Sequence, residues 1–250
     1  MSKRILITGA SRGIGLSIAK SLATIGYDLV LLTSSDSSAD RLKRMDFVRK
    51  SGADVYPVDQ SSCEAIEIFT EAWSGELWGI INNAAICKTF RLISDGDDPL
   101  EEVLKTNLIG PYMLTKKLLP HITRPGRILN IASQLGKEGR EGYSAYCASK
   151  FALIGMTKCW AKELGREGVT VNAICPGWVN TEMTQLDLDR MARDQNISAE
   201  KFYENIVEPL ELKRFNSTEE VANLVTFLFS EEASGITGRD WLMQTIWNQK

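Results

Sequence analysis

Three side chains in the middle of the sequence have the types and spacing of an acid–base site. Tyr146 and Lys150 stand four residues apart, about one helical turn, so a helix would present them on the same face. A lysine ammonium beside a phenol favours the phenolate and lowers the pKa of the tyrosine. Ser133, at the end of a predicted strand, would share one substrate oxygen with Tyr146. This set of groups can protonate a carbonyl oxygen, or deprotonate an alcohol, during hydride transfer.

Neighbouring side chains offer weaker candidates for the same chemistry. Tyr143 precedes Tyr146 but has Cys147, not a lysine, four residues later, so we interpret it as pocket wall or packing. Cys147 has no basic partner in the motif and is expected to be a buried small side chain, not a nucleophile. His121 is the single histidine of the chain, which argues against a Ser-His-Asp triad and a histidine-rich metal site. We therefore predict no metal centre.

The elements that would position these residues alternate along the chain. Short apolar runs are typical of strands at Arg4–Thr8, Leu29–Thr33, Val55–Val58, Trp78–Asn82, Arg127–Ile131, Thr170–Ile174 and Asp240–Met243. Amphipathic segments between them predict helices at Ile14–Ile25, Ala39–Lys50, Cys63–Trp73, Leu100–Leu119, Tyr146–Leu164 and Glu219–Phe229. This alternation indicates a parallel sheet covered on both faces. We predict a single-domain, Rossmann-type doubly wound α/β fold over residues 1–250, with about seven strands.

The least regular segment spans residues 178–216 and follows a predicted strand end. It carries apolar residues at Met183, Leu186, Met191 and Phe202. A segment in this place is expected to form a mobile helical lid over a pocket. A plain surface insertion is the alternative interpretation.

A glycine-rich turn connects the first predicted strand to the first predicted helix. It covers Gly9–Gly15 and has the spacing T-G-x-x-x-G-x-G. Glycines permit a tight turn and let backbone amides approach a pyrophosphate, and the start of the helix supplies partial positive charge. In this context the turn predicts a dinucleotide-binding site.

The end of the second predicted strand bears on which dinucleotide binds. Folds that bind NAD place an acidic residue there for the ribose 2′-hydroxyl, whereas this chain has Thr33, followed by Ser34 and Ser35. No carboxylate at these positions repels a 2′-phosphate, and Arg12 in the glycine turn can pair with one. We therefore predict NADP(H) in preference to NAD(H), with Asp36 as the carboxylate that would favour NAD(H) if it turned inward.

The composition excludes several other classes of protein. The chain has 250 residues and a formal net charge of −3, without the basic stripe that nucleic-acid binding requires. No apolar stretch approaches the length of a membrane span. The five cysteines are odd in number and contain no C-x-x-C pair, which argues against a disulfide framework. A reducing cytoplasm is the expected setting.

In their order along the chain, these motifs resemble those of the short-chain dehydrogenase/reductases. The resemblance runs from residue 4 to about residue 238 and rests on the glycine turn, Asn82-Asn83-Ala84-Ala85, Asn107, Ser133, Tyr146-x-x-x-Lys150 and Pro176-Gly177. Within that family the sequence looks most similar to 3-oxoacyl-acyl-carrier-protein reductases and related ketoreductases.

The resemblance implies a role for each catalytic position. Tyr146 would be the general acid or base, and Lys150 would lower its pKa and hydrogen-bond the nicotinamide ribose. Ser133 would orient the substrate oxygen. Asn107 would hold a water near Lys150 as part of a proton relay. Asp59 would meet the adenine amino group.

The resemblance also implies two wider sets of binding residues. The cofactor set is Gly9, Ser11, Arg12, Gly13, Ile14, Gly15, Thr33, Ser34, Asp59, Gln60, Asn83, Ala84, Ala85, Tyr146, Lys150, Pro176, Gly177, Val179 and Thr181. The substrate set is Gln134, Leu135, Tyr143 and Trp178.

Two departures from the family pattern bear on assembly and docking. After Ile236-Thr237-Gly238 the glycines of the usual C-terminal turn are missing, and the tail continues from Arg239 to Trp247. Because of this difference, the C-terminal packing and one tetramer interface that are usual in the family do not carry over directly to this chain. Arg124 offers a positive charge for an acidic carrier protein, but Glu167 stands where a second basic residue would help.

These expectations describe an NADP(H)-dependent oxidoreductase acting on a carbonyl or secondary alcohol. A 3-oxoacyl thioester, carried by acyl-carrier protein or coenzyme A, is the first expected substrate. There are two alternatives. The first is a reductase of a sugar, polyol or secondary-metabolite ketone, and the second is a non-catalytic NADP(H) sensor. The family implies a homotetramer or homodimer, and no nucleic acid or membrane partner is expected.

Overall fold

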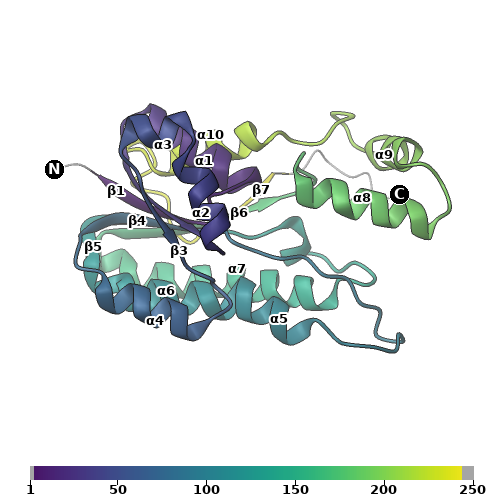
Figure 1. Cartoon of the computed structure of the whole chain (residues 1–250), viewed down its shortest axis with the longest axis horizontal. Coiled ribbons are helices and arrows are strands. Elements are labelled where there is room, and N and C mark those ends of the chain that lie inside the picture. The colour runs from purple at the N-terminus through teal and green to yellow at the C-terminus, as the bar shows by residue number, and fades with distance from the viewer. Residues whose placement is uncertain (1–2, 244–250) are drawn as a thin grey trace.

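Seven parallel strands form one sheet in the computed structural model, which describes residues 3–243 (Figure 1). The strands are β1 (Arg4–Thr8), β2 (Asp28–Thr33), β3 (Asp54–Pro57), β4 (Leu77–Asn82), β5 (Ile122–Ile131), β6 (Val169–Pro176) and β7 (Asp240–Met243). Their order is β3-β2-β1-β4-β5-β6-β7. The chain therefore starts in the middle, winds to one edge and then crosses to the other side. The strand order reverses between β1 and β4, where open α/β sheets bind their ligands.

Helices cover both faces of this sheet. They are α1 (Gly13–Thr24), α2 (Asp36–Lys43), α3 (Asp46–Ser51), α4 (Cys63–Ala72), α5 (Leu100–Leu104), α6 (Gly110–Leu118), α7 (Ser144–Leu164), α8 (Glu182–Asp194), α9 (Ala199–Val207) and α10 (Thr218–Leu228). Figure 1 shows α1, α3 and α10 on one face of the sheet and α4, α6 and α7 on the other. Short helical turns lie at Lys105–Ile109, Leu119–His121, Gln134–Gly136 and Gly165–Glu167.

The strands are apolar on both sides because each face carries its own core. In β1, Ile5 and Ile7 pack with α1, α2, α3 and α10, whereas Leu6 between them packs with α4, α6 and α7. Successive side chains of a strand point to opposite faces, so a strand covered on both faces is a continuous apolar run. The predicted doubly wound Rossmann-type fold is thereby confirmed.

Two predicted helices are wrong in detail. The segment 39–50 is divided between α2 and α3, because Met45 is extended (φ −72°, ψ 139°) and packs against the core beneath α1. The segment 100–119 is not one α-helix, since a π-helical turn at Lys105–Ile109 separates α5 from α6. Such π turns are frequent at functional sites.

The C-terminal segment forms the edge strand β7 over Asp240–Met243, as its apolar run predicted. β7 pairs with β6, and Asp240 forms ion pairs with Lys137 and Lys158. The rest of the unusual tail, from residue 244, lies outside the described residues. Among residues 3–243, no helix has the length and apolar character that a membrane crossing requires.

Candidate active site

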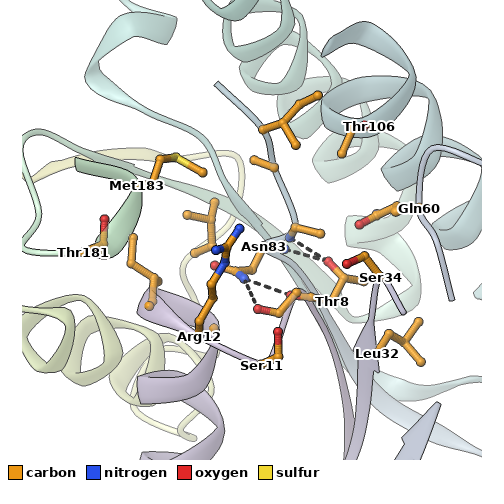
Figure 2. A pocket seen from close by; sticks show the side chains of 18 of the residues that line it. Thr8, Ser11, Arg12, Leu32, Ser34, Gln60, Asn83, Thr106, Thr181 and Met183 are labelled. Carbon is orange, nitrogen blue, oxygen red and sulfur yellow. Dashed lines mark hydrogen bonds between the residues drawn. The ribbon is translucent and has the colours of Figure 1, made fainter. Parts of the chain in front are cut away.

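A cavity of about 430 Å³ opens where the carboxyl ends of β1, β2 and β4 meet (Figure 2). Its wall combines the glycine turn, the ends of β3, β5 and β6, the start of α7 and the start of α8. All of the residues in the predicted cofactor set lie in this wall. The fold thus brings together segments that are far apart in the sequence, at the switch point of the strand order.

The glycine turn is shaped by close backbone approaches. Gly9 has φ +65°, and a Cβ atom there would lie 2.8 Å from Cα of Ala84. A Cβ atom on Gly15 would collide with the carbonyl oxygen of Gly9 and the side-chain nitrogen of Asn83. Helix α1 begins at Gly13, within this turn, and its N-cap residue, Arg12, provides no side-chain acceptor for the first N–H groups. These donors and the helix dipole suit a phosphate group.

Asn83 and Thr8 join the glycine turn to the end of β4. The Asn83 side chain donates hydrogen bonds to the carbonyl oxygens of Thr8 (2.9 Å) and Gly9 (3.2 Å). The Thr8 hydroxyl accepts from the backbone N–H groups of Asn83 (3.0 Å) and Ala84 (2.9 Å). Figure 2 shows this set of bonds at the floor of the cavity. The cavity-lining position of Thr8 was absent from the predicted set, although the threonine of the T-G-x-x-x-G-x-G spacing indicated it.

The end of β2 carries hydroxyl groups and no carboxylate. Thr33 and Ser34 line the cavity, whereas Asp36 is exposed as the first residue of α2 and lies outside the wall. Asp59 lies in the wall, where its carboxylate accepts hydrogen bonds from Ser61. Neither Thr33 nor Ser34 carries a negative charge that would repel a 2′-phosphate at the end of β2.

Gln60 and Arg12 have surroundings that the sequence did not reveal. Gln60 is 6% exposed, and neither its amide nitrogen nor its amide oxygen has a hydrogen-bond partner among the described residues. Arg12 was expected to face a 2′-phosphate, but its guanidinium donates to Glu182 of α8 at 2.8 Å. Glu182 itself lines the cavity and was absent from the predicted set.

The acid–base residues meet at the start of α7. Tyr146 and Lys150 occupy successive turns of this helix, and the Lys150 Nζ atom lies 5.6 Å from the centre of the Tyr146 ring. Ser133 follows β5, and its hydroxyl accepts from the N–H of Leu135 at 3.1 Å. All three side chains line the cavity. The structure brings the phenol, the ammonium and the hydroxyl to one end of it.

Burial, and not the lysine, dominates the electrostatics of these three residues. Burial raises the pKa of Tyr146, the nearby Cys87 thiol raises it further, and the hydrogen bond with Ser133 lowers it. Burial also lowers the pKa of Lys150 to about 8. The Lys150 ammonium donates to the carbonyl oxygen of Ile131 at 2.8 Å. In the chain without cofactor, burial thus outweighs the effects that lower the pKa of Tyr146, and the expected role of Lys150 in lowering it stays a prediction.

Asn107 lies behind the cavity wall, in the π-helical turn. Its side-chain nitrogen donates to the carbonyl oxygen of Ile86 (2.9 Å), and its side-chain oxygen accepts from the Ile86 N–H (2.9 Å). The same nitrogen lies 3.2 Å from the hydroxyl of Ser149, which donates to the carbonyl oxygen of Tyr146. Asn107 thus fixes the loop after β4 relative to the start of α7. The expected water relay stays a prediction.

The predicted substrate residues do not line this cavity. Gln134, Leu135 and Tyr143 are nearly buried, and Trp178 stacks on Phe215 with ring centres 5.3 Å apart. None of the four lines this cavity, and their role in binding the substrate stays a prediction.

A polar cluster occupies the space beside them. The Tyr143 hydroxyl donates to Asp187 (3.2 Å) and accepts from Arg190 (3.0 Å), both on α8. Arg190 also donates to Asp187 at 3.0 Å. These contacts hold α8 against the start of α7.

Among residues 3–243, no group of three or more metal-ligating side chains is present.

Comparisons with known proteins agree with this geometry. Residues 9–244 match the family described as Enoyl-(Acyl carrier protein) reductase. The 3-oxoacyl-[acyl-carrier-protein] reductase of Staphylococcus epidermidis is 33% identical, covering 96% of each chain. A variant of actinorhodin polyketide ketoreductase, solved with NADPH, is 31% identical, with a TM-score of 0.89 and coverage of 98% of this chain and 96% of that one.

A sugar reductase has the same fold. The L-sorbose reductase of Gluconobacter frateurii, solved with NADPH and L-sorbose, is 25% identical, with a TM-score of 0.89 and coverage of 100% of this chain and 97% of that one. The family match spans most of the sequence, and the reductase relative covers nearly the whole chain. With the glycine turn, the Tyr146–Lys150 pair and Ser133 at one cavity, the chain belongs to the short-chain dehydrogenase/reductase family.

Proposed function

We propose that this protein is an NADP(H)-dependent ketoreductase whose substrate is a 3-oxoacyl thioester. The observation that carries the proposal is a cavity that joins the glycine turn to the side chains of Tyr146, Lys150 and Ser133. A dinucleotide fits this site because Gly9 and Gly15 leave no room for side chains and the first N–H groups of α1 have no capping acceptor. Thr33, Ser34 and Arg12 would hold the 2′-phosphate.

The chemistry divides between the cofactor and the chain. When bound, the cofactor supplies the hydride that is added to the carbonyl carbon. Tyr146, protonated at neutral pH, donates its proton to the carbonyl oxygen. Ser133 hydrogen-bonds the same oxygen, where negative charge develops during the reaction. Lys150 is placed to hold the nicotinamide ribose, and Asn107 positions the loop that carries Ile86.

The thioester assignment draws on the relatives named 3-oxoacyl-[acyl-carrier-protein] reductase. In the alternative, a sugar or polyol ketone is reduced by the same residues. The likeness to the L-sorbose reductase solved with NADPH and L-sorbose supports this alternative. Arg124 does not favour the predicted contact with a carrier protein, because its guanidinium already forms an ion pair with Glu167 at 2.9 Å.

We also propose that residues 178–216 act as a lid over the substrate. Its two ends lie together, because Val179 pairs with Asn216. Between them α8 and α9 have a small core of their own, which includes Leu188, Phe202 and Phe215. A reducing cytoplasm remains the proposed setting, consistent with five free cysteines.

The proposal is tested by following NADPH consumption with a panel of ketones, repeated with NADH. Short 3-oxoacyl thioesters are compared with sugar ketones and cyclic ketones, and Tyr146→Phe serves as the inactive control. We expect turnover with NADPH, fastest on the thioesters. Turnover fastest on a sugar ketone would favour the alternative substrate. NADPH binding without turnover of any ketone would contradict the enzyme assignment and favour a sensor.

A further inference from the structure

An ion pair joins the glycine turn to helix α8 at the mouth of the cavity. The Arg12 guanidinium donates to the Glu182 carboxylate at 2.8 Å, and both residues line the cavity. Arg12 is the N-cap residue of α1, and Glu182 is the first residue of α8. The cation of the glycine turn is therefore already paired with a carboxylate of the chain.

This pairing matters because the cavity wall has few cations. The basic side chains in this wall are Arg12 and Lys150. Lys150 is buried and donates to the carbonyl oxygen of Ile131, at the other end of the site. A phosphate beside Thr33 and Ser34 therefore has Arg12 as its available cationic partner in this wall. To reach that phosphate, the Arg12 side chain must turn away from Glu182.

The surroundings of the ion pair allow Arg12 to change partner from Glu182 to a phosphate. Thr181 caps α8, with its hydroxyl accepting from the Thr184 N–H at 3.2 Å, so the helix start does not depend on Glu182. A Cβ atom on Gly13 would lie 3.6 Å from the Thr181 side chain, so the glycine turn and the start of α8 are in close approach. Both partners are largely exposed (64% and 63%), and an exposed pair is weak enough for a ligand to break.

We propose that Glu182 competes with the 2′-phosphate of the cofactor for Arg12 and so tunes the preference between NADPH and NADH. The inference rests on the proposed binding of NADP(H). A cofactor with a 2′-phosphate must displace Glu182 from Arg12, whereas NADH leaves the pair intact. Glu182 would then be a specificity-determining residue that lowers the affinity for NADPH.

The test is a binding titration of the full-length, cofactor-free protein with NADPH and with NADH. Glu182→Gln keeps the size of the side chain and removes its charge. We expect the Kd for NADPH to fall about threefold, the scale of one exposed ion pair, with the Kd for NADH unchanged. Asp189→Asn is the matched control, because Asp189 lies on the same helix and accepts from Gln185. This control should leave the ratio of the two Kd values as in the wild type.

A double-mutant cycle separates competition from a general charge effect. In an Arg12→Gln background, Glu182→Gln should no longer change the Kd for NADPH. An effect that persists there, an equal effect on both cofactors, or a weaker NADPH affinity in Glu182→Gln would overturn the inference. The wild-type titration tests the proposed function separately. If wild-type protein binds neither cofactor, the proposed function fails before the competition is addressed.

Discussion

At the scale of single residues, the chemistry depends on the groups that surround the Tyr146 hydroxyl and shift its pKa. Partial burial and the nearby Cys87 raise the pKa of this half-buried phenol, so in the free protein it carries the proton that a general acid must donate. Its link to Ser133 directs both hydroxyl groups to the same region of the cavity. In the oxidative direction the phenol would have to lose its proton first.

Replacing Tyr146 by phenylalanine should abolish most of the activity. The variant keeps the ring and loses the proton donor, so we expect kcat to fall by about 100-fold or more, the scale of lost general-acid catalysis. Steady-state kinetics measure the change, and a titration should give an unchanged Kd for NADPH. Tyr56→Phe, on the edge strand β3, is the control and should keep its full rate. An active Tyr146→Phe enzyme would contradict the assignment.

The buried amine of Lys150 predicts a particular dependence of stability on pH. Its pKa is about 8 in the folded protein and 10.5 as the ordinary value, so the unfolded chain binds more protons between these pH values. The free energy of unfolding should therefore rise with pH over this window. The rise is expected to be about 3 kcal/mol at most for this group. Denaturant titrations of cofactor-free wild type and Lys150→Met would measure it as their difference, and a flat difference would contradict the lowered pKa.

At the scale of elements, the glycine turn and the π-helical turn build the site. Gly9 and Gly15 let β1, α1 and the end of β4 approach within contact distance. The π-helical turn places Asn107 where its amide holds both backbone groups of Ile86. Neither device adds a reacting group. Each fixes the backbone on which the reacting groups and the cofactor would rest.

A methyl group at Gly15 should damage this packing. In Gly15→Ala the new Cβ atom meets the Gly9 carbonyl and Asn83, so we expect the free energy of unfolding to fall by about 1–3 kcal/mol, as overpacking does. NADPH binding should weaken in parallel. Gly165→Ala is the matched control, since Gly165 has helical φ and ψ and open space around its Cα. Thermal or denaturant unfolding compares the two, and equal stabilities would contradict the close approach.

At the scale of the whole molecule, one helical face exposes large apolar side chains. Ile109, Tyr112 and Phe151 are each more than 40% exposed on the segment from the π-helical turn to α7. The family resemblance implies assembly through the segments Leu100–Leu119 and Tyr146–Leu164, which carry these three side chains. We propose that it forms a subunit contact in a homodimer or homotetramer.

Charge placed on that face should separate the subunits. Phe151→Glu adds a charge that would be costly to bury in a contact, so we expect a smaller species in sedimentation velocity at equal concentration. The far-ultraviolet circular dichroism should be unchanged, because Phe151 lies at an exposed position of α7. Leu242→Glu, on the edge strand β7, is a parallel test of the second interface. A wild-type protein that sediments as a monomer would remove the proposal.

The class of fold, the glycine turn and the candidate acid–base set could be predicted from the amino-acid sequence. These features depend on short-range properties: the alternation of apolar runs with amphipathic segments, and the four-residue spacing of Tyr146 and Lys150. The breaks at Met45 and at the π-helical turn were missed, because helical periodicity continues across both.

What surrounds each of these residues depended on the folded chain. Arg12 turns to Glu182, which is 170 positions away in the sequence. The pKa of Tyr146 is raised because burial outweighs the hydrogen bond with Ser133. The Tyr143 hydroxyl donates a hydrogen bond to Asp187 of α8. Charge pairing and burial depend on side chains that distant segments bring into contact, and no local pattern encodes them.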